Sequence, residues 1–395
     1  IRLPAVISSN MVLQQQSDAR LWGWSEPGEK IFVTTSWNGR IDSVTATGNA
    51  VWEIKVPTPV AGGPYTITLK GRNTIVLENV LIGEVWICSG QSNMEWSSDN
   101  NLKQIIDEMP ASYNPSIRLF HITKTTATTP QDDCEGIWKV SSPESLPGFS
   151  AIAYFFGKKL QQQLNVPIGL ISTSWGGTPA ETWTPVETVT SQTDLQENAK
   201  QLKPSKWWPV EPALTYNAMI YPVTRFAIAG AIWYQGESNT NTASGYKKLF
   251  SSMIQDWRNA WKKEFPFYFV QIAPYTYGNH NVGALLREQQ WQTLNAVART
   301  GMVVTTDLVD DVKNIHPNDK LSVANRLANW ALAENYKKPV MAYQSPAYAK
   351  MEQEGDKIIL SFDHAPGGLV IRDNGKIAEL FIAGDDQVFF PAEAK

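Results

Sequence analysis

The fold of this chain is decided by residues 80–94, which read VLIGEVWICSGQSNM. The apolar run Val80–Cys88 has the composition of a strand that is buried on both faces of a sheet. Ser89-Gly90-Gln91-Ser92 follows directly, and its glycine permits a tight turn that presents a hydroxyl group. The stretch therefore predicts a buried strand followed by a loop that carries reactive side chains.

The same pattern repeats along residues 80–345, where apolar runs alternate with segments of helical periodicity. The other predicted strands are Ile117–Ile122, Ile168–Thr173, Phe226–Tyr234, Phe267–Ala273 and Met302–Thr306, and the predicted helices are Ser150–Leu164, Gly245–Lys263, Gly283–Ala298 and Lys320–Tyr336. Buried strands that alternate with helices predict an α/β fold, a doubly wound parallel sheet with helices on both faces.

Both ends of the chain have β character. Short runs rich in β-branched and aromatic residues, separated by turns such as Asn38-Gly39, predict an N-terminal β-sandwich domain over residues 1–79. The α/β catalytic domain then covers residues 80–345. A C-terminal β segment over residues 346–395 contains Lys357–Phe362, Gly368–Arg372 and Ala378–Ile382, and we expect its sheet to be completed by something outside this chain.

The overall composition excludes several classes of protein. The net charge is −4 and no cluster of Lys and Arg stands out, which argues against a nucleic-acid partner or an anionic lipid surface. The longest apolar runs fall short of the ~20 residues that a membrane helix needs. The 16 tryptophans and 13 tyrosines are compatible with glycan binding, although burial in the core explains any single one of them more readily.

The two cysteines and the first residue bear on the cellular compartment of the protein. Cys88 and Cys134 predict no metal site and leave two alternatives open, one disulfide or two buried thiols. The chain begins at Ile1, which fits a periplasmic or secreted protein whose leader was removed, or equally a sequence cut there by design.

Four segments with reactive side chains follow predicted strands. They are Ser89–Trp96, Ser174–Trp183, Gln235–Asn239 and Asp307–Pro317. Because parallel strands share one carboxyl edge, these loops converge in space. Together they supply a hydroxyl, an imidazole, a Gly-Gly turn and side-chain amides, which are the parts of an acyl-transfer site.

These four segments resemble the SGNH hydrolases, and specifically the sialate O-acetylesterase branch of the carbohydrate esterases. The resemblance extends to Leu3–Val6, Asn10–Gln15, Trp22–Trp24, Pro27–Glu29 and Ala218–Pro222, and so covers nearly the whole chain. The presence of both Ser89–Trp96 and Trp233–Asn239 in one chain makes the resemblance specific. It implies an SGNH-type hydrolase that needs no cofactor and no metal.

The resemblance implies that Ser92 is the nucleophile and that His316 is the general base. A hydroxyl at a strand-to-helix turn is exposed to a base, although a serine at that place also often caps a helix. Of the other histidines, His121 lies in an apolar strand, His280 in a polar loop and His364 in the late β segment.

The oxyanion hole is expected to use backbone amides and one side-chain amide. The backbone donors are Ser92 and either Gly176 or Gly177, although two glycines also suit an ordinary tight turn. In many SGNH enzymes an asparagine supplies the side-chain amide, which points to Asn239, with Gln235 as its rival.

The third triad member departs from the family pattern. SGNH enzymes usually place an aspartate three residues before the histidine, and here that position is Lys313. Three alternatives remain for the group that orients His316: Asp311, Glu237, or a backbone carbonyl such as that of Asn314, which would leave a Ser–His dyad.

The predicted substrate is an O-acetylated sugar, bound by Gln91, Trp175, Glu181, Trp183 and Arg287. An arginine would suit a substrate that bears a carboxylate, although Arg287 could equally form an ion pair on a helix surface. The resemblance favours acetyl esters of sialic acid. Two alternatives stay open, deacetylation of xylan or another hemicellulose, and a non-catalytic glycan-binding protein.

Overall fold

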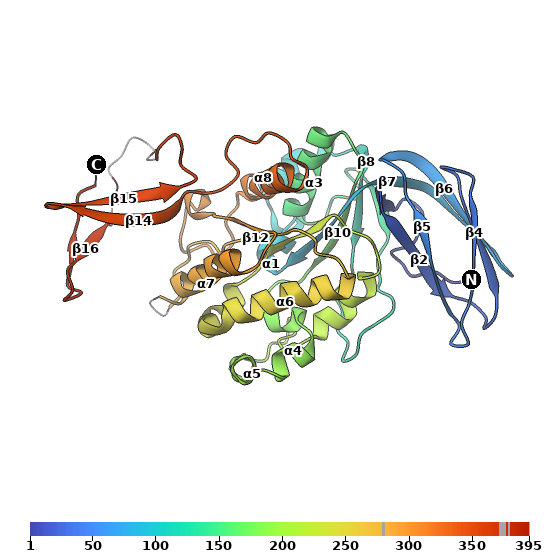
Figure 1. Cartoon of the computed structure of the whole chain (residues 1–395), viewed down its shortest axis with the longest axis horizontal. Coiled ribbons are helices and arrows are strands. Elements are labelled where there is room, and N and C mark those ends of the chain that lie inside the picture. Colours follow the sequence, from blue (N-terminus) through green and yellow to red (C-terminus); the bar gives the residue numbers. More distant parts are fainter. Residues whose placement is uncertain (279–280, 371–376, 378–379, 395) are drawn as a thin grey trace. The chain divides into compact units, whose positions relative to one another are not determined.

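The computed structural model describes residues 1–278, 281–370, 377 and 380–394 (Figure 1). Contacts divide the chain into two compact units, Ile1–Tyr343 and Gln344–Lys395. Each unit is described by itself.

The first unit is built around a largely parallel sheet. Its strand order is β13-β12-β11-β7-β10-β8-β9, with β7 (Thr74–Gly90), β8 (Asn114–His121), β9 (Trp138–Ser141), β10 (Ile168–Ser174), β11 (Gly230–Tyr234), β12 (Phe267–Val270) and β13 (Thr300–Val303). All neighbours pair in parallel except β8 and β9. The α/β class predicted from the sequence is confirmed.

Helices cover both faces of this sheet (Figure 1). Along β7, Trp86 and Cys88 share a buried core with α3 (Ala151–Leu164) and α8 (Lys320–Trp330). Val85 and Ile87 share the opposite core with α6 (Tyr246–Trp261) and Leu286 of α7 (Val282–Ala296). Successive side chains of a strand point to opposite faces, so this strand is apolar throughout because both faces are covered.

Several predicted elements are shorter than expected; Phe267–Ala273 is strand only to Val270, and Met302–Thr306 is strand only to Val303. The run Phe226–Tyr234 becomes a strand only at Gly230, because the residues before it follow a 3-10 turn at Tyr221–Val223. The helix predicted to Tyr336 ends at Trp330 and continues as a π-helical turn over Ala331–Asn335. Apolar periodicity marks what is buried and not where backbone hydrogen bonding changes.

The first residues form two facing sheets. One pairs β2 (Asp18–Trp24) with β5 (Val51–Pro57), and the other joins β1 (Val12–Gln14), β3 (Lys30–Thr35), β4 (Ile41–Thr45), β6 (Gly62–Lys70) and the start of β7. Leu21 and Trp52 of the first sheet and Val33 and Leu69 of the second lie in the same buried core.

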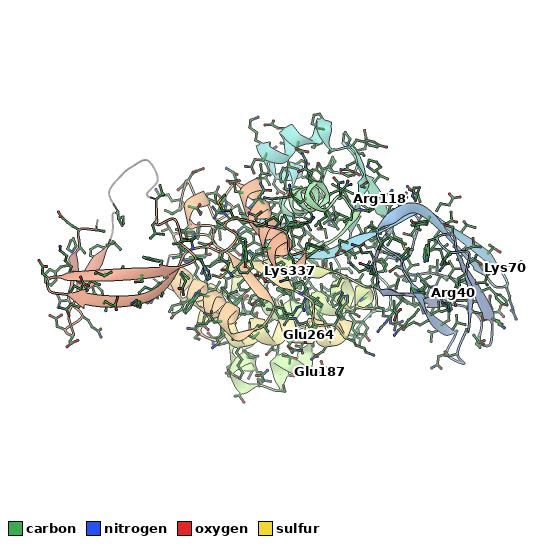
Figure 2. All side chains as sticks on the ribbon, turned by 45° about the horizontal axis from the view of Figure 1, so that its top comes forward. Arg40, Lys70, Arg118, Glu187, Glu264 and Lys337 are labelled. Atoms are coloured by element: carbon green, nitrogen blue, oxygen red, sulfur yellow. The ribbon has the colours of Figure 1, made fainter. Side chains whose placement is uncertain are left out.

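β7 runs without interruption from this sandwich into the central sheet, so the boundary predicted between residues 79 and 80 falls inside one strand. Arg118 of β8 lies at the junction, whereas Arg40 and Lys70 lie on the sandwich (Figure 2). The buried Arg118 guanidinium donates to the carbonyl oxygens of Asn10 and Asn79 at 3.2 and 3.3 Å.

The second unit consists of two antiparallel pairs, β14 (Ala347–Glu354) with β15 (Lys357–Asp363) and β16 (Phe381–Ala383) with β17 (Phe389–Pro391). Of the strand predicted over Gly368–Arg372, residues 368–370 are not strand, and the remainder lies outside the described residues. The strand predicted over Ala378–Ile382 is described only from residue 380, and its strand part is β16.

Cys88 and Cys134 are both free thiols, which decides between the two alternatives that the sequence left open. In the part of the chain that the structure describes, no helix is both long and apolar enough to cross a membrane. The same residues contain no group of three or more His, Cys, Asp or Glu side chains arranged to hold a metal ion.

Candidate active site

Ser92 is placed by a close approach between two strands. β7 ends at Gly90, whose φ of +144° disfavours any other residue, and a side-chain carbon there would lie 2.2 Å from the carbonyl oxygen of Tyr234 on β11. Gln91 then donates its backbone N–H to that same oxygen at 2.9 Å. The short helix α1 (Ser92–Glu95) begins immediately, so Ser92 lies at the carboxyl edge of the central sheet.

The hydroxyl of Ser92 faces the imidazole of His316. The distance from Oγ to Nε2 is 2.9 Å, which is a hydrogen bond. Helix α1 is capped at Gln91 without a side-chain hydrogen bond, so Ser92 is not the helix cap that its position on a turn also allowed. The two residues therefore form a pair suited to proton transfer, called here the Ser92–His316 pair.

Three contacts fix the position of His316. Its ring stacks on Trp96, with ring centres 4.1 Å apart and planes 24° from parallel. Its backbone N–H donates to Oδ1 of Asn314 at 2.9 Å. The carbonyl oxygen of Ile315, one residue earlier, accepts a hydrogen bond from Nδ2 of Asn93 at 3.0 Å.

Neither expected carboxylate reaches the imidazole. Asp311 is exposed, and its carboxylate accepts the backbone N–H of Lys313 at 2.8 Å. Glu237 is buried and bonds to Asn93 instead. Among the described residues, Nδ1 of His316 has no hydrogen-bond partner, and Asn314 contacts the histidine backbone through its side chain rather than through its carbonyl.

A buried polar network lies directly behind Ser92. Lys320, at the start of α8, donates from Nζ to Oδ1 of Asn93 at 2.6 Å. Asn93 in turn donates to Oε1 of Glu237, whose Oε2 is buried without a partner in the described structure. The ammonium group also lies 5.7 Å from the ring centres of both Trp96 and Tyr234.

Burial shifts the pKa values of the groups in this network. It raises the pKa of Glu237 and lowers the pKa of Lys320 to about 7. Burial, followed by the positive charge of Lys320, lowers the pKa of His316 to about 4. At neutral pH the imidazole is therefore unprotonated and available to accept a proton.

In the described part of the chain, only one of the two backbone N–H groups of the Gly-Gly turn is free to bind a further acceptor. The N–H of Gly176 donates to the carboxylate of Glu95, which also forms an ion pair with Lys124. Within the described residues, the backbone N–H groups of Ser92 and Gly177 donate to no acceptor. Of the two glycines, Gly177 is therefore the one whose amide is free to bind an oxyanion.

The two side-chain amides expected at the oxyanion hole are already engaged. Asn239 donates to the carboxylate of Glu181 at 2.8 Å. Gln235 donates to the carbonyl oxygen of Thr178 at 3.2 Å and to Asn239 at 2.7 Å. Gln91 accepts two backbone N–H groups of the loop after β11 at 3.2 and 3.4 Å, and its own NH₂ group donates to no acceptor among the described residues.

The substrate residues predicted from the sequence differ in their exposure and in how close they lie to the Ser92–His316 pair. Trp175 lies in the loop that contacts Ser92, and its indole N–H donates to the carbonyl oxygen of Trp207 at 3.1 Å. Trp183 and Glu181 are fully buried, so neither side chain is accessible to a substrate. Arg287 is half-buried on α7, and no contact in the described structure joins it to the Ser92–His316 pair.

Sequence reasoning missed the residues that support the pair. Asn93, Glu95 and Trp96 all lie in the segment Ser89–Trp96, and their closeness to Ser92 in the sequence was the available signal. Lys320 lies at the first position of a predicted helix, where a lysine is ordinarily exposed. The pattern gave no sign that its ammonium group is buried.

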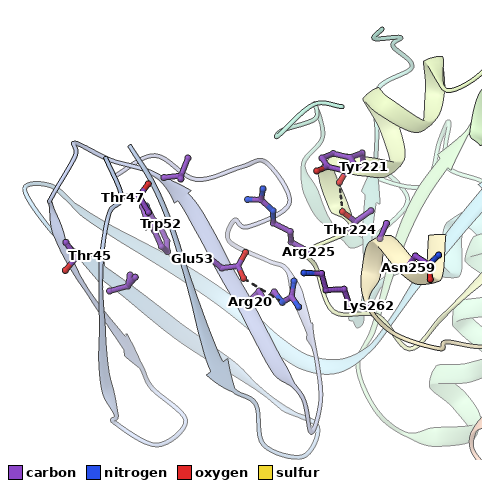
Figure 3. Close-up of a pocket in the computed structure, with 13 residues that line it drawn as sticks. Arg20, Thr45, Thr47, Trp52, Glu53, Tyr221, Thr224, Arg225, Asn259 and Lys262 are labelled. Carbon is purple, nitrogen blue, oxygen red and sulfur yellow. Dashed lines mark hydrogen bonds and ion pairs between the residues drawn. The ribbon is translucent and has the colours of Figure 1, made fainter. Parts of the chain in front are cut away.

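A pocket of about 680 Å³ lies elsewhere, between the sandwich and the α/β part of the first unit (Figure 3). Arg20, Trp52 and Glu53 line it from the sandwich, and Arg225 and Lys262 line it from segments that precede β11 and β12. It therefore lies toward the amino ends of these strands, whereas Ser92 follows the carboxyl end of β7.

The chain is similar to known carbohydrate esterases along its whole length. Residues 82–333 match the family described as "Carbohydrate esterase, sialic acid-specific acetylesterase". The sialate O-acetylesterase of Rattus norvegicus is 29% identical over 98% of this chain and 83% of its own length. That of Homo sapiens is 28% identical over 97% of this chain and 80% of its own length.

A solved structure agrees with these sequence relatives. The crystal structure of a carbohydrate acetylesterase from Xanthomonas citri superposes with a TM-score of 0.87 at 32% identity, and the match covers 100% of this chain and 88% of that one. The chain belongs to the sialic acid-specific acetylesterase family of carbohydrate esterases.

Proposed function

We propose that this carbohydrate esterase hydrolyses O-acetyl esters of sugars through an acetyl-enzyme formed on Ser92, with His316 as general base. The observation that carries the proposal is the 2.9 Å contact from Oγ to Nε2, made to an imidazole whose pKa is about 4. A base that is neutral at pH 7 and bonded to a hydroxyl is arranged to take its proton.

The reaction then takes two steps. Oγ of Ser92 attacks the acetyl carbonyl carbon while Nε2 of His316 takes the hydroxyl proton, and a tetrahedral oxyanion forms. The imidazolium returns that proton to the sugar oxygen as the carbon–oxygen bond of the ester breaks, and the free sugar leaves. Water attacks the acetyl-enzyme, again with proton transfer through His316, and acetate is released.

Packing and loop contacts take the place of the orienting carboxylate in this proposal. An aspartate in a triad fixes the tautomer and ring orientation of the histidine and stabilises the imidazolium. Here the stacking on Trp96 fixes the ring plane, and the bond from Asn93 to the carbonyl of Ile315 fixes the loop. The active site is therefore proposed as a Ser–His dyad.

The oxyanion is assigned to the donors that remain free. These are the backbone N–H groups of Ser92 and Gly177, joined by the NH₂ group of Gln91, whose oxygen is held by the loop after β11. A preorganised donor of this kind is worth roughly 2.7–4 kcal/mol in the transition state.

The sugar is proposed to be sialic acid, on the strength of the family description and of the mammalian relatives. One observation favours a second candidate, a neutral acetylated sugar such as a hemicellulose unit. Lys124 is linked to the Gly-Gly turn through Glu95, which accepts the N–H of Gly176. The ion pair with Glu95 already offsets the charge of Lys124. Arg287, expected to bind a carboxylate, has no contact with the Ser92–His316 pair.

Acetate release from O-acetylated sialic acids and from acetylated xylan, measured for the wild type and for Ser92→Ala, tests the proposal. We expect the wild type to release acetate from at least one of them and Ser92→Ala to fall to background. Equal, near-background rates for both proteins would contradict esterase activity. Preference for xylan would retain the mechanism and overturn sialic acid as the substrate.

A further inference from the structure

The loop that precedes Pro209 presents a large aromatic side chain to solvent. Trp207 has 79% of its surface exposed, whereas tryptophan side chains are highly buried on average. Trp208 beside it is half-buried. Two adjacent indoles at the edge of a candidate active site offer a rigid aromatic surface of the kind that lines ligand sites.

Two contacts hold this loop rigidly against the catalytic loops. The carbonyl oxygen of Trp207 accepts the indole N–H of Trp175 at 3.1 Å. The ring of Trp208 lies on Gly177 so closely that a side-chain carbon at Gly177 would stand 2.3 Å from it. Gly177 has a φ of +82°, so both its backbone conformation and this packing require glycine.

The same turn contacts the nucleophile on its other side. A side-chain carbon at Gly176 would lie 3.2 Å from Cβ of Ser92. The Gly-Gly turn therefore contacts Ser92 through Gly176 and Trp208 through the next residue, Gly177. The indoles of this loop thus lie one turn of backbone away from the residue proposed to attack the ester.

We propose that Trp207 and Trp208 form a binding subsite for the pyranose ring that carries the acetyl group. The subsite rests on the proposed function, because its ligand is the alcohol part of the ester that Ser92 attacks. Pyranose rings have C–H faces that pack against aromatic faces, and an indole offers a large, rigid surface for this contact. Trp208 fixes the subsite on the turn, and Trp207 supplies the accessible face.

The test compares Trp207→Ala with Trp291→Ala. Trp291 is an exposed indole on α7 (43% exposed) and serves as the matched control. The alanine variant at 207 keeps the backbone carbonyl that Trp175 binds, so the loop stays anchored. The substrates are ethyl acetate, which has no ring, and an O-acetylated methyl pyranoside.

We expect Trp207→Ala to lower kcat/KM for the acetylated pyranoside by about tenfold. Its kcat/KM for ethyl acetate should stay at the wild-type value, Trp207→Phe should recover most of the loss, and Trp291→Ala should match the wild type on both substrates. An unchanged kcat/KM for the pyranoside, or an equal loss on both substrates, would overturn the subsite. A wild type inactive on both esters would instead contradict the proposed function.

Discussion

Replacing Lys320 by methionine is expected to move the acid limb of the pH profile of kcat/KM to higher pH. The base form of His316 is the neutral imidazole, and the limb marks the pKa of that group in the free enzyme. A positive charge nearby disfavours the imidazolium and lowers this pKa. The pKa of Lys320 is about 7, so the lysine is charged throughout the acid limb and its removal must raise the pKa of His316.

The size of the effect follows from the position of the limb. With a pKa of about 4, half of His316 is unprotonated at pH 4 in the wild type. Loss of a unit charge in a partly buried site raises the limb by about one pH unit, so the unprotonated fraction at pH 4 falls to about one tenth. Burial remains in the variant, so the limb stays below the ordinary histidine value.

The assay is kcat/KM for a soluble acetate ester over roughly pH 3.5 to 8, a range that brackets the pKa values of His316 and Lys320. Lys313→Met is the control, because Lys313 is an exposed lysine of the loop that carries His316. The height of the plateau is free to change, since Asn93 loses a donor, and the position of the limb is the readout. A Lys320→Met limb that coincides with the wild type, or a wild-type limb near the ordinary histidine pKa, would refute the reasoning.

Two further predictions concern the support of His316. Asp311→Asn should leave kcat within a few-fold of the wild type, because this exposed carboxylate bonds to the backbone of Lys313; a loss of orders of magnitude in steady-state assays would identify it as the orienting acid. Asn93→Ala should lower kcat at least about tenfold, since the carbonyl of Ile315 and the buried side chains of Glu237 and Lys320 lose their common partner. An Asn93→Ala enzyme with wild-type kcat in the same assay would show that the loop holds His316 unaided.

The sequence predicts that the loops of Ser92 and His316 converge because convergence depends on topology, and the family resemblance then selects these two residues. Apolar runs mark the parallel strands, and parallel strands bring the loops after them to one edge. The residues are 224 positions apart, yet the 2.9 Å contact follows once both loops lie at that edge. The α/β class is predictable for the same reason, since the alternation of strands and helices is a local signal.

The supporting residues are not predictable in this way, because their roles depend on side-chain packing. The family spacing suggested an acid near position 313, but the loop turns so that the Asp311 carboxylate accepts the backbone N–H of Lys313. Lys320 is buried because the start of α8 approaches Asn93, and no periodicity encodes that approach. Asn239 and Gln235 have the right chemistry for an oxyanion hole, but their donors are used by neighbouring loops.

The continuity of β7 has a consequence for how the protein unfolds. One strand of 17 residues begins in the sandwich, crosses the central sheet and ends two residues before the nucleophile. The sandwich cannot be deleted or exchanged without cutting the strand on which the central sheet is built. Residues 1–343 are therefore expected to melt as one cooperative unit. Contacts within the sandwich should then help to stabilise, against unfolding, the edge of the central sheet that carries Ser92.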